Sequence, residues 1–179
     1  VVDAELSLVI VDDAAGNPLA LVTSFAAHPT TLGAWNRQLS ADYPGVLAQM
    51  VEARYPEAVC LFVAGAVGDQ GPVKQGSGFE AAQHLGGALA AKAVALIEGP
   101  PRGEMATLAA SQRVVALPKA QVRLGRWTLP GWLSRGLVDD DATLSVVSVG
   151  SALFIGVPCD LGAELGVALK RAARARGFQ

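Results

Sequence analysis

The sequence lacks most of the features that would point directly to a class of function. It contains two cysteines in 179 residues, too few for a disulfide framework, and Cys60 lies in an apolar segment where a buried thiol is expected. No apolar run approaches the roughly 20 residues that are needed to cross a bilayer. The formal net charge is -2, and no cluster of Lys and Arg is interleaved with aromatic residues. Nucleic acid is therefore not expected as a partner.

Common catalytic motifs are absent as well. There is no Gly-x-Ser-x-Gly elbow, no His-Glu-x-x-His helix and no Walker-type phosphate loop, which removes the usual hydrolase and nucleotide-binding signatures. The chain is nevertheless 51% hydrophobic, so it can bury a core. A single domain, or a fragment of one, over residues 1–179 is the expectation for this length.

The order of apolar segments predicts an α/β fold with a mixed β-sheet, hairpins, and helices packed on the sheet. Strands are predicted at 5–11, 19–25, 59–67, 107–117, 144–149 and 152–157, and helices at 43–54, 79–98 and 161–176. Residues 118–141 have no clear period and are predicted to be an irregular excursion. Asp42 or Tyr43 is expected to cap the first helix, and Gly86 and Gly87 to pack against the sheet.

Three predicted strands end in polar turns, at residues 25–30, 68–71 and 158–160. In α/β sheets, functional sites gather at the carboxyl ends of strands. If these ends lie side by side, His28, Asp69 and Asp160 bring one imidazole and two carboxylates to one rim. Such a ligand set suits zinc or another divalent ion.

Each of these residues also has an ordinary structural interpretation. His28 can be a satisfied core or turn residue, and Asp160 can be the N-cap of the last helix. Asp69 lies beside glycine and can simply form a turn. His84, in an Ala-rich helical segment, is expected to be structural.

Four segments, taken in order and spacing, resemble the neutral/alkaline (non-lysosomal) ceramidase family, as an internal part of its N-terminal catalytic domain. They are Ser24-Phe25-Ala26-Ala27-His28-Pro29-Thr30, then Asn36 and Ser40-Ala41-Asp42 with Gly45, then Phe62-Val63-Ala64-Gly65-Ala66-Val67-Gly68-Asp69, and Ile155-Gly156-Val157-Pro158-Cys159-Asp160-Leu161. The resemblance implies a zinc-dependent hydrolase of sphingolipid metabolism that cleaves the amide bond of ceramide or a similar hydrophobic amide.

The resemblance also implies roles for individual residues. His28 corresponds to a zinc-ligating histidine of the family, and Asp160 falls where the family has a glutamate ligand. Asp69 and Gly71 occupy the positions of a catalytic turn. Asn36 and Asp42 are expected to fix the turn that carries His28, acting behind the ligand.

One position departs from the family pattern, because Gly71 stands where the family has its catalytic serine. Backbone amides near Gly71 are the expected substitute for binding a developing oxyanion. The departure leaves two alternatives open: a scaffold that binds a ligand without catalysis, and a hydrolase of a different substrate such as a short acyl amide or ester.

The resemblance carries expectations about partners and location too. A further histidine and a tyrosine ligand are expected from segments outside this sequence, so the remainder of the same catalytic domain is an expected partner. A lipid-like amide substrate, contact with a membrane surface, and an extracellular or periplasmic location complete these expectations.

Overall fold

The computed structural model describes residues 1–100, 106–119, 121, 123–128 and 139–179. The chain forms two compact units, so the single domain or fragment that the sequence predicts has two parts. The first unit consists of Val1–Glu104 with Asp160–Arg176, and the second of Met105–Cys159 with Gly177–Gln179. None of the described helices is both long and apolar enough to cross a bilayer.

The sheet of the first unit is mixed, as the sequence predicts. Strand β1 (Ser7–Asp12) pairs antiparallel with β2 (Pro18–Phe25), which pairs parallel with β3 (Val59–Ala64). The register places Phe25 opposite Ala64, so β2 and β3 end together. The turns that follow these two strands therefore begin at the same edge of the sheet.

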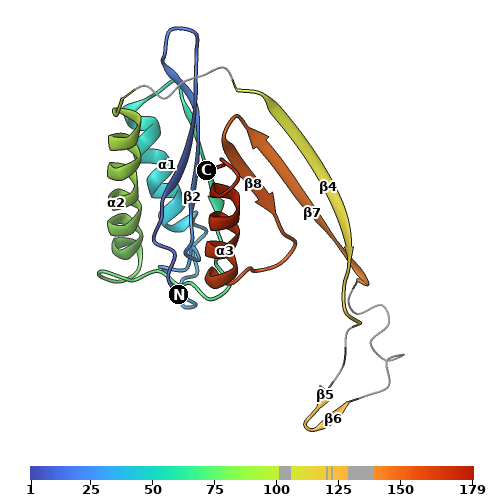
Figure 1. The fold of residues 1–179 in the computed structure, drawn as a ribbon. Coiled ribbons are helices and arrows are strands. Elements are labelled where there is room, and N and C mark those ends of the chain that lie inside the picture. Colours follow the sequence, from blue (N-terminus) through green and yellow to red (C-terminus); the bar gives the residue numbers. More distant parts are fainter. Residues whose placement is uncertain (101–105, 120, 122, 129–138) are drawn as a thin grey trace. The chain divides into compact units, whose positions relative to one another are not determined.

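Two helices, α1 (Asp42–Arg54) and α2 (Phe79–Ile97), cover one face of this sheet (Figure 1). The alternation of β3 agrees with a sheet covered on that face, because Cys60 is buried whereas Leu61 is 52% exposed. The core of the unit lies between this face and the helices. Its buried members are Leu21, Tyr43, Leu47, Val51, Ala58, Cys60, Leu89, Ala90 and Ala93.

Gly86 brings α2 close to α1 and not to the sheet, which corrects the sequence-based expectation. A Cβ atom at Gly86 would lie 2.6 Å from the carbonyl oxygen of Tyr43 and 2.6 Å from the Cβ atom of Val46. A Cβ atom at Gly87 would make an ordinary contact of 3.6 Å with Met50. The Ala-rich segment thus uses one glycine for close approach between two helices, a distinction that composition does not reveal.

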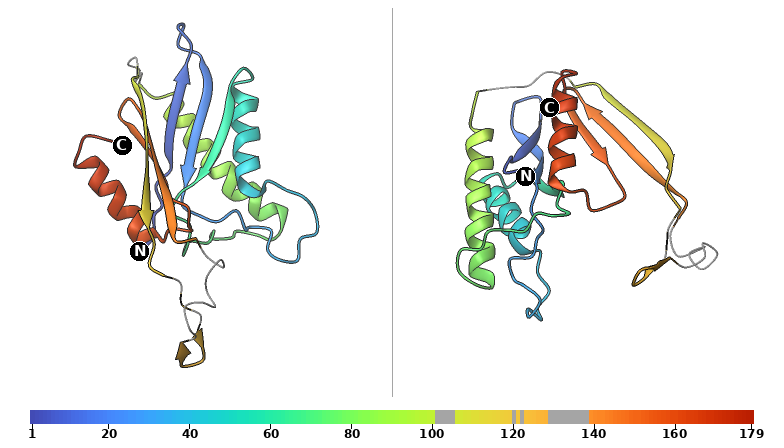
Figure 2. Two further views of the ribbon diagram at one scale, coloured as in Figure 1. Left: turned by 90° about the vertical axis from the view of Figure 1, so that its right-hand side faces the viewer. Right: turned by 60° about the horizontal axis from the view of Figure 1, so that its bottom comes forward.

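The third helix, α3 (Ala163–Arg174), lies on the opposite side of the sheet from α1 and α2 (Figure 2). Its Gly166 fits against Ala66 in the segment that follows β3, with no room for a Cβ atom. The start of α3 is therefore held next to the carboxyl end of β3.

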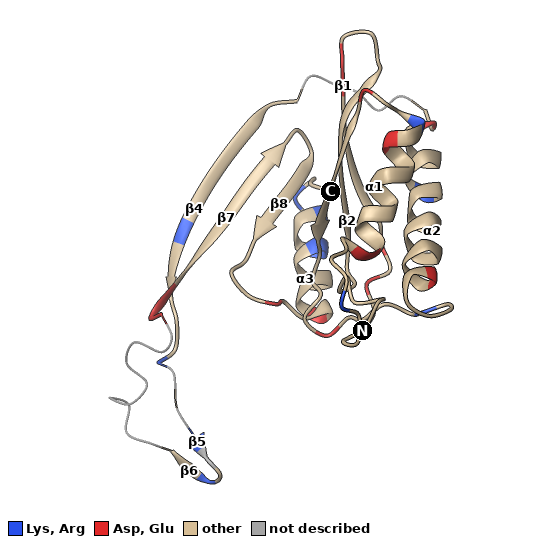
Figure 3. Ribbon diagram, turned by 180° about the vertical axis from the view of Figure 1, so that it is seen from behind, with Lys and Arg blue, Asp and Glu red and all other residues tan. Residues whose placement is uncertain are grey.

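Ion pairs fasten α3 to the N-terminal segment. The ammonium group of Lys170 lies 2.7 Å from the buried carboxylate of Asp3, and the guanidinium of Arg174 donates two hydrogen bonds of 2.6 Å to Glu5. The Arg174 hydrogen bonds lower the pKa of Glu5 below its ordinary value. Figure 3 marks the positions of the basic residues of α3 in blue on the ribbon.

Among its described residues, the second unit contains strands and no helix. It contains an antiparallel sheet in the order β4-β7-β8 and a two-residue ladder between β5 and β6, and its strands are β4 (Leu108–Ala116), β5 (Arg123–Leu124), β6 (Trp127–Thr128), β7 (Asp141–Val149) and β8 (Ala152–Gly156). The predicted hairpin around Gly150 is present. Within the predicted excursion of 118–141, the short β5–β6 hairpin is described, while residues 120, 122 and 129–138 lie outside the described residues.

Candidate functional site

Backbone hydrogen bonds join the three predicted strand-end segments at one rim of the first unit. The amide of His28 donates to the carbonyl of Gln70 at 3.0 Å, and the amide of Gly68 donates to the carbonyl of Leu161 at 2.9 Å. Side-chain atoms are not needed for this assembly. The turn after β2, the loop after β3 and the segment before α3 therefore meet, as the sequence argument assumed.

The turn that carries His28 is organised by Asp42. The hydroxyl of Thr31 donates to the Asp42 carboxylate at 2.6 Å, and the amide of Leu32 donates to it at 3.1 Å. Asp42 is 7% exposed, so these bonds are made in a largely dry environment. The side chain of Asp42 binds this turn as it was expected to do, although its role behind a metal ligand stays a prediction.

The expectation that Asp42 or Tyr43 caps α1 is wrong. The cap position is Ala41, which supplies no side-chain hydrogen bond, and Asp42 lies in the first turn with its carboxylate directed to the His28 turn. Asp42 is also the one non-glycine residue with positive φ, +54°, among the described residues. Such a conformation costs on the order of 1 kcal/mol or more and persists where surrounding contacts over-determine it.

Tyr43 is the residue that the sequence argument did not assign to this site. Its hydroxyl donates to the carbonyl oxygen of Ala27 at 2.5 Å, directly before His28, and its side chain is fully buried. Burial, followed by the charge of Asp42, raises the pKa of Tyr43 above its ordinary value, so the hydroxyl stays a donor. The sequence signal for this contact is a tyrosine at the start of a predicted helix. Nothing in the neighbouring residues indicates that its hydroxyl binds the carbonyl of Ala27.

The side chain of Asn36 binds within its own loop. Its amide donates to the carbonyl of Gln38 at 2.7 Å, and its carbonyl oxygen accepts from the amide of Gln38 at 3.2 Å. These bonds shape the segment between His28 and α1. They do not reach the His28 turn itself, so the expected role of Asn36 behind His28 stays a prediction.

Asp69 links the loop after β3 to the start of α3. Its carboxylate accepts a hydrogen bond of 2.7 Å from the amide of Ala163, which lies 94 residues further along the chain. That bond is the main cause of a lowered pKa for Asp69, followed by a bond from the Gln70 side chain. Asp69 thus supplies the side-chain acceptor at the N-terminus of α3.

Asp160 is exposed and is not the N-cap of α3. The cap position is Gly162, and the bond to the first helical amide comes from Asp69. The carbonyl of Asp160 packs so closely against Gly68 that a Cβ atom there would overlap it. The backbone at Asp160 is therefore tied to the loop after β3, while its carboxylate is left at the surface of the rim.

Gly71 leaves open space at the same rim. No atom lies within 4 Å of the place where a Cβ atom would be, and its φ is not in the left-handed region. Among the described residues, its amide has no hydrogen-bond acceptor, whereas the amides of Gly68 and Gln70 already donate to Leu161 and Val67. The Gly71 amide is therefore available to an oxygen atom of a bound molecule.

The donor set fits part of a zinc site. His28 is half-buried and Asp160 exposed, and imidazole and carboxylate are both ligands that zinc accepts. Within the described residues, however, no three His, Cys, Asp or Glu side chains are grouped to hold a metal ion. A catalytic zinc site usually takes three protein ligands, so the described residues supply fewer than such a site needs.

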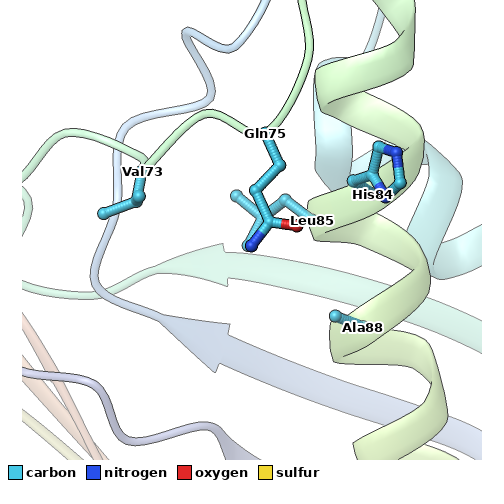
Figure 4. A pocket seen from close by; sticks show the side chains of 5 residues that line it. All are labelled: Val73, Gln75, His84, Leu85 and Ala88. Carbon is cyan, nitrogen blue, oxygen red and sulfur yellow. The ribbon is translucent and has the colours of Figure 1, made fainter.

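The other histidine lies in a different place. His84 on α2 lines a hollow of about 90 Å³ together with Val73, Gln75, Leu85 and Ala88 (Figure 4). The imidazole is more than half exposed and lies 4.0 Å from Glu80 on the same helix. The structural role expected for His84 stays a prediction.

Solved structures show which known fold this chain shares. The crystal structure of neutral ceramidase from Pseudomonas aeruginosa superposes with a TM-score of 0.74 at 18% identity, over 99% of this chain and 38% of that chain. A structure of ceramidase complexed with C2 gives a TM-score of 0.72 at 18% identity, over 99% of this chain and 40% of that one. No protein-family model and no curated protein matches the sequence.

These comparisons confirm the predicted fold. The chain has the mixed α/β fold of a portion of neutral ceramidase, and it spans about two-fifths of the length of the ceramidases it matches. At 18% identity the likeness concerns the fold, because many activities share one scaffold.

Proposed function

We propose that this chain forms one side of the active site of a zinc-dependent hydrolase that cleaves the amide bond of ceramide or a similar hydrophobic amide. The observation that carries this proposal is the assembly of His28, the 68–71 loop and the segment at Asp160 on one rim, in a chain with the fold of part of neutral ceramidase. The fold alone would be weak support for this function, because one fold hosts many activities. The rim adds specific residues whose side chains and backbone amides can take part in the reaction.

Each residue of the rim receives a role in this proposal. His28 and Asp160 would ligate the metal, and a bound zinc ion would polarise the amide carbonyl and lower the pKa of a water molecule. The free amide of Gly71 would donate to the oxygen of the substrate carbonyl as negative charge develops there. Asp69 would keep that amide in place by fastening the loop to α3.

The partners follow from what the rim lacks. Because His28 and Asp160 are fewer ligands than a catalytic zinc needs, the remaining ligands would come from other parts of the same catalytic domain. We propose a lipid-like amide as substrate and contact with a membrane surface as the route by which such a substrate arrives. Lipid substrates partition into membranes, so contact with that surface brings the enzyme to them.

The alternative is a ceramidase-like scaffold that binds a ligand without catalysis. Gly71 is the observation that favours it, because a glycine offers no hydroxyl at the family's serine position. The two proposals differ in their need for metal. A scaffold without chemistry has no requirement for stoichiometric zinc, whereas the hydrolase does.

The experiment uses the full-length protein and a matched pair of histidine variants. Zinc content and release of fatty acid from a ceramide with a labelled acyl chain are measured for the native protein, His28→Ala and His84→Ala. We expect His28→Ala to lose both zinc and hydrolysis, and His84→Ala to keep both. Unchanged zinc content and hydrolysis in His28→Ala would remove the proposal, and a native protein without either would favour the scaffold.

A further inference from the structure

The aromatic ring of Tyr43 is fixed in the core of the first unit. It packs edge-to-face with Phe25, at 6.5 Å between ring centroids, and with Phe62, at 5.6 Å. Phe25 is the last residue of β2, and Phe62 lies within the neighbouring strand β3. Because such packing restrains a ring in both position and tilt, the hydroxyl at its end also has a defined position.

That hydroxyl is directed to the backbone next to His28. It donates to the carbonyl of Ala27 at 2.5 Å, and Ala27 is itself 4% exposed. A phenol that is removed from water needs a partner, and here the partner belongs to the peptide unit that enters His28. Rotating that peptide unit would leave the hydroxyl and the carbonyl unpaired in the core.

Asp42 restrains the same turn on the other side of His28. Through Thr31 and Leu32 it fixes the residues after His28, while Tyr43 fixes the residue before it. Two consecutive residues at the start of α1 therefore hold both ends of a short turn. Asp42 does so at a positive φ, the kind of conformation that gathers at functional sites.

We infer that Tyr43 is a positioning residue for His28, which holds the imidazole at the rim through the carbonyl of Ala27. Tyr43 is not a catalytic residue, because its hydroxyl is engaged within the core and directed at backbone. The expected effect of Tyr43 on zinc binding rests on the proposed function, whereas its effect on the position of the His28 ring does not. The two can therefore fail separately.

The test uses Tyr43→Phe, which removes the hydroxyl but keeps the ring and its packing. Tyr55→Phe is the matched control, since it removes the other tyrosine hydroxyl of the chain, beyond the end of α1. Two measurements are made on the full-length protein: the NMR signals of the His28 ring without metal, and the affinity for zinc. The signals that disappear in His28→Ala are those of His28.

We expect Tyr43→Phe to shift and broaden the His28 ring signals and to weaken zinc binding by about 10-fold, the lower end of the effect of removing a group behind a metal ligand. Tyr55→Phe should change neither. A purely structural role would lower stability but leave the His28 ring signals and the zinc affinity of the folded protein unchanged. That result would overturn the inference.

Other outcomes are also decisive. If the native protein binds no zinc, the proposed function fails, and the His28 signals still decide the role of Tyr43. If Tyr43→Phe does not fold, 3-fluorotyrosine is incorporated site-specifically at position 43, so that this residue alone is labelled and carries a more acidic hydroxyl. Shifted His28 signals would support the inference, and unshifted ones would contradict it.

Discussion

The two turns that leave β2 and β3 begin at the same edge of one sheet but are held in different ways. The turn at His28 is fixed by the buried side chains of Asp42 and Tyr43, whereas the 68–71 loop is exposed and held by backbone bonds and one exposed carboxylate. Buried polar contacts are costly to leave unpaired, and exposed ones are not. We therefore expect substitutions that break the contacts of the His28 turn to lower the free energy of unfolding strongly, and substitutions in the exposed loop to have smaller effects.

The largest effect should follow from Asp42→Ala. This change leaves the Thr31 hydroxyl and the Leu32 amide without their acceptor, at a position that also has positive φ. We expect the free energy of unfolding to fall by about 3 kcal/mol in chemical denaturation. Asp12→Ala, at an exposed position on β1, should change it by less than about 0.5 kcal/mol. Equal losses of stability in the two variants would show that the contacts of Asp42 do not stabilise the His28 turn.

Gly86→Ala should have the next largest effect, because it presses on the start of α1. Its Cβ atom would lie 2.6 Å from the Tyr43 carbonyl, which is backbone and cannot move freely. We expect a loss of about 2 kcal/mol in the free energy of unfolding. Gly87→Ala, the adjacent control, has only Met50 at 3.6 Å and should stabilise the helix by up to about 1 kcal/mol. A neutral Gly86→Ala would contradict the close helix contact.

Within the loop itself, substitution should lower the free energy of unfolding much more at Gly68 than at Gly71. Gly71→Ser introduces a side chain into open space, so the free energy of unfolding should change by no more than about 0.5 kcal/mol. Gly68→Ser would overlap the Asp160 carbonyl and should cost about 2 kcal/mol. Thermal unfolding of both variants checks this difference.

Gly71→Ser also distinguishes the proposed hydrolase from the scaffold without catalysis. It installs a hydroxyl at the position where the ceramidase family has its serine, with no expected loss of stability. We expect faster hydrolysis of a labelled ceramide by the full-length variant. A variant that folds normally and shows no hydrolysis would favour the scaffold.

Much of this fold follows from local pattern. Alternation and apolar runs predict the three helices and the strands β1 to β4, β7 and β8 to within a few residues, but not the short strands β5 and β6. The turn signal at Gly150 predicts the last hairpin. The position of His28 at the end of a buried strand is also a local feature. These predictions hold because each depends on residues that are neighbours along the chain.

The parts that sequence reasoning missed depend on distant partners. Asp69 reaches Ala163 across 94 residues, and Tyr43 reaches Ala27 across 16. The contact of the Asp42 carboxylate with the His28 turn was expected from the family resemblance, whereas local preference alone suggested a cap of α1. At Asp42, Tyr43 and Asp69, contacts with distant residues determine the structure more than local propensity does, and all three residues lie at the candidate site.

The smallest expected effect concerns the pH dependence of the loop. The Ala163 amide lowers the pKa of Asp69 in the folded state, so the ionised form stabilises the fold above the ordinary pKa of an aspartate. This contribution is lost as the pH falls through the lowered, folded-state pKa. Asp69→Asn should flatten the acid limb of the stability profile and speed exchange of the Ala163 amide.

Asp13→Asn serves as the control for that prediction. Asp13 also has a lowered pKa, caused by bonds from Asn17, but it lies in the β1–β2 turn. Its replacement should alter the acid limb without changing exchange of the Ala163 amide. If both variants changed that exchange equally, Asp69 would not be the specific link to α3.

Zinc binding at the rim around His28 can be tested by anomalous diffraction at the zinc edge, with crystals of the full-length protein. We expect a zinc peak about 2.0–2.1 Å from an imidazole nitrogen of His28, with Asp160 in the same coordination shell. Zinc bound elsewhere, with His28 outside its coordination shell, would show that His28 is not a zinc ligand.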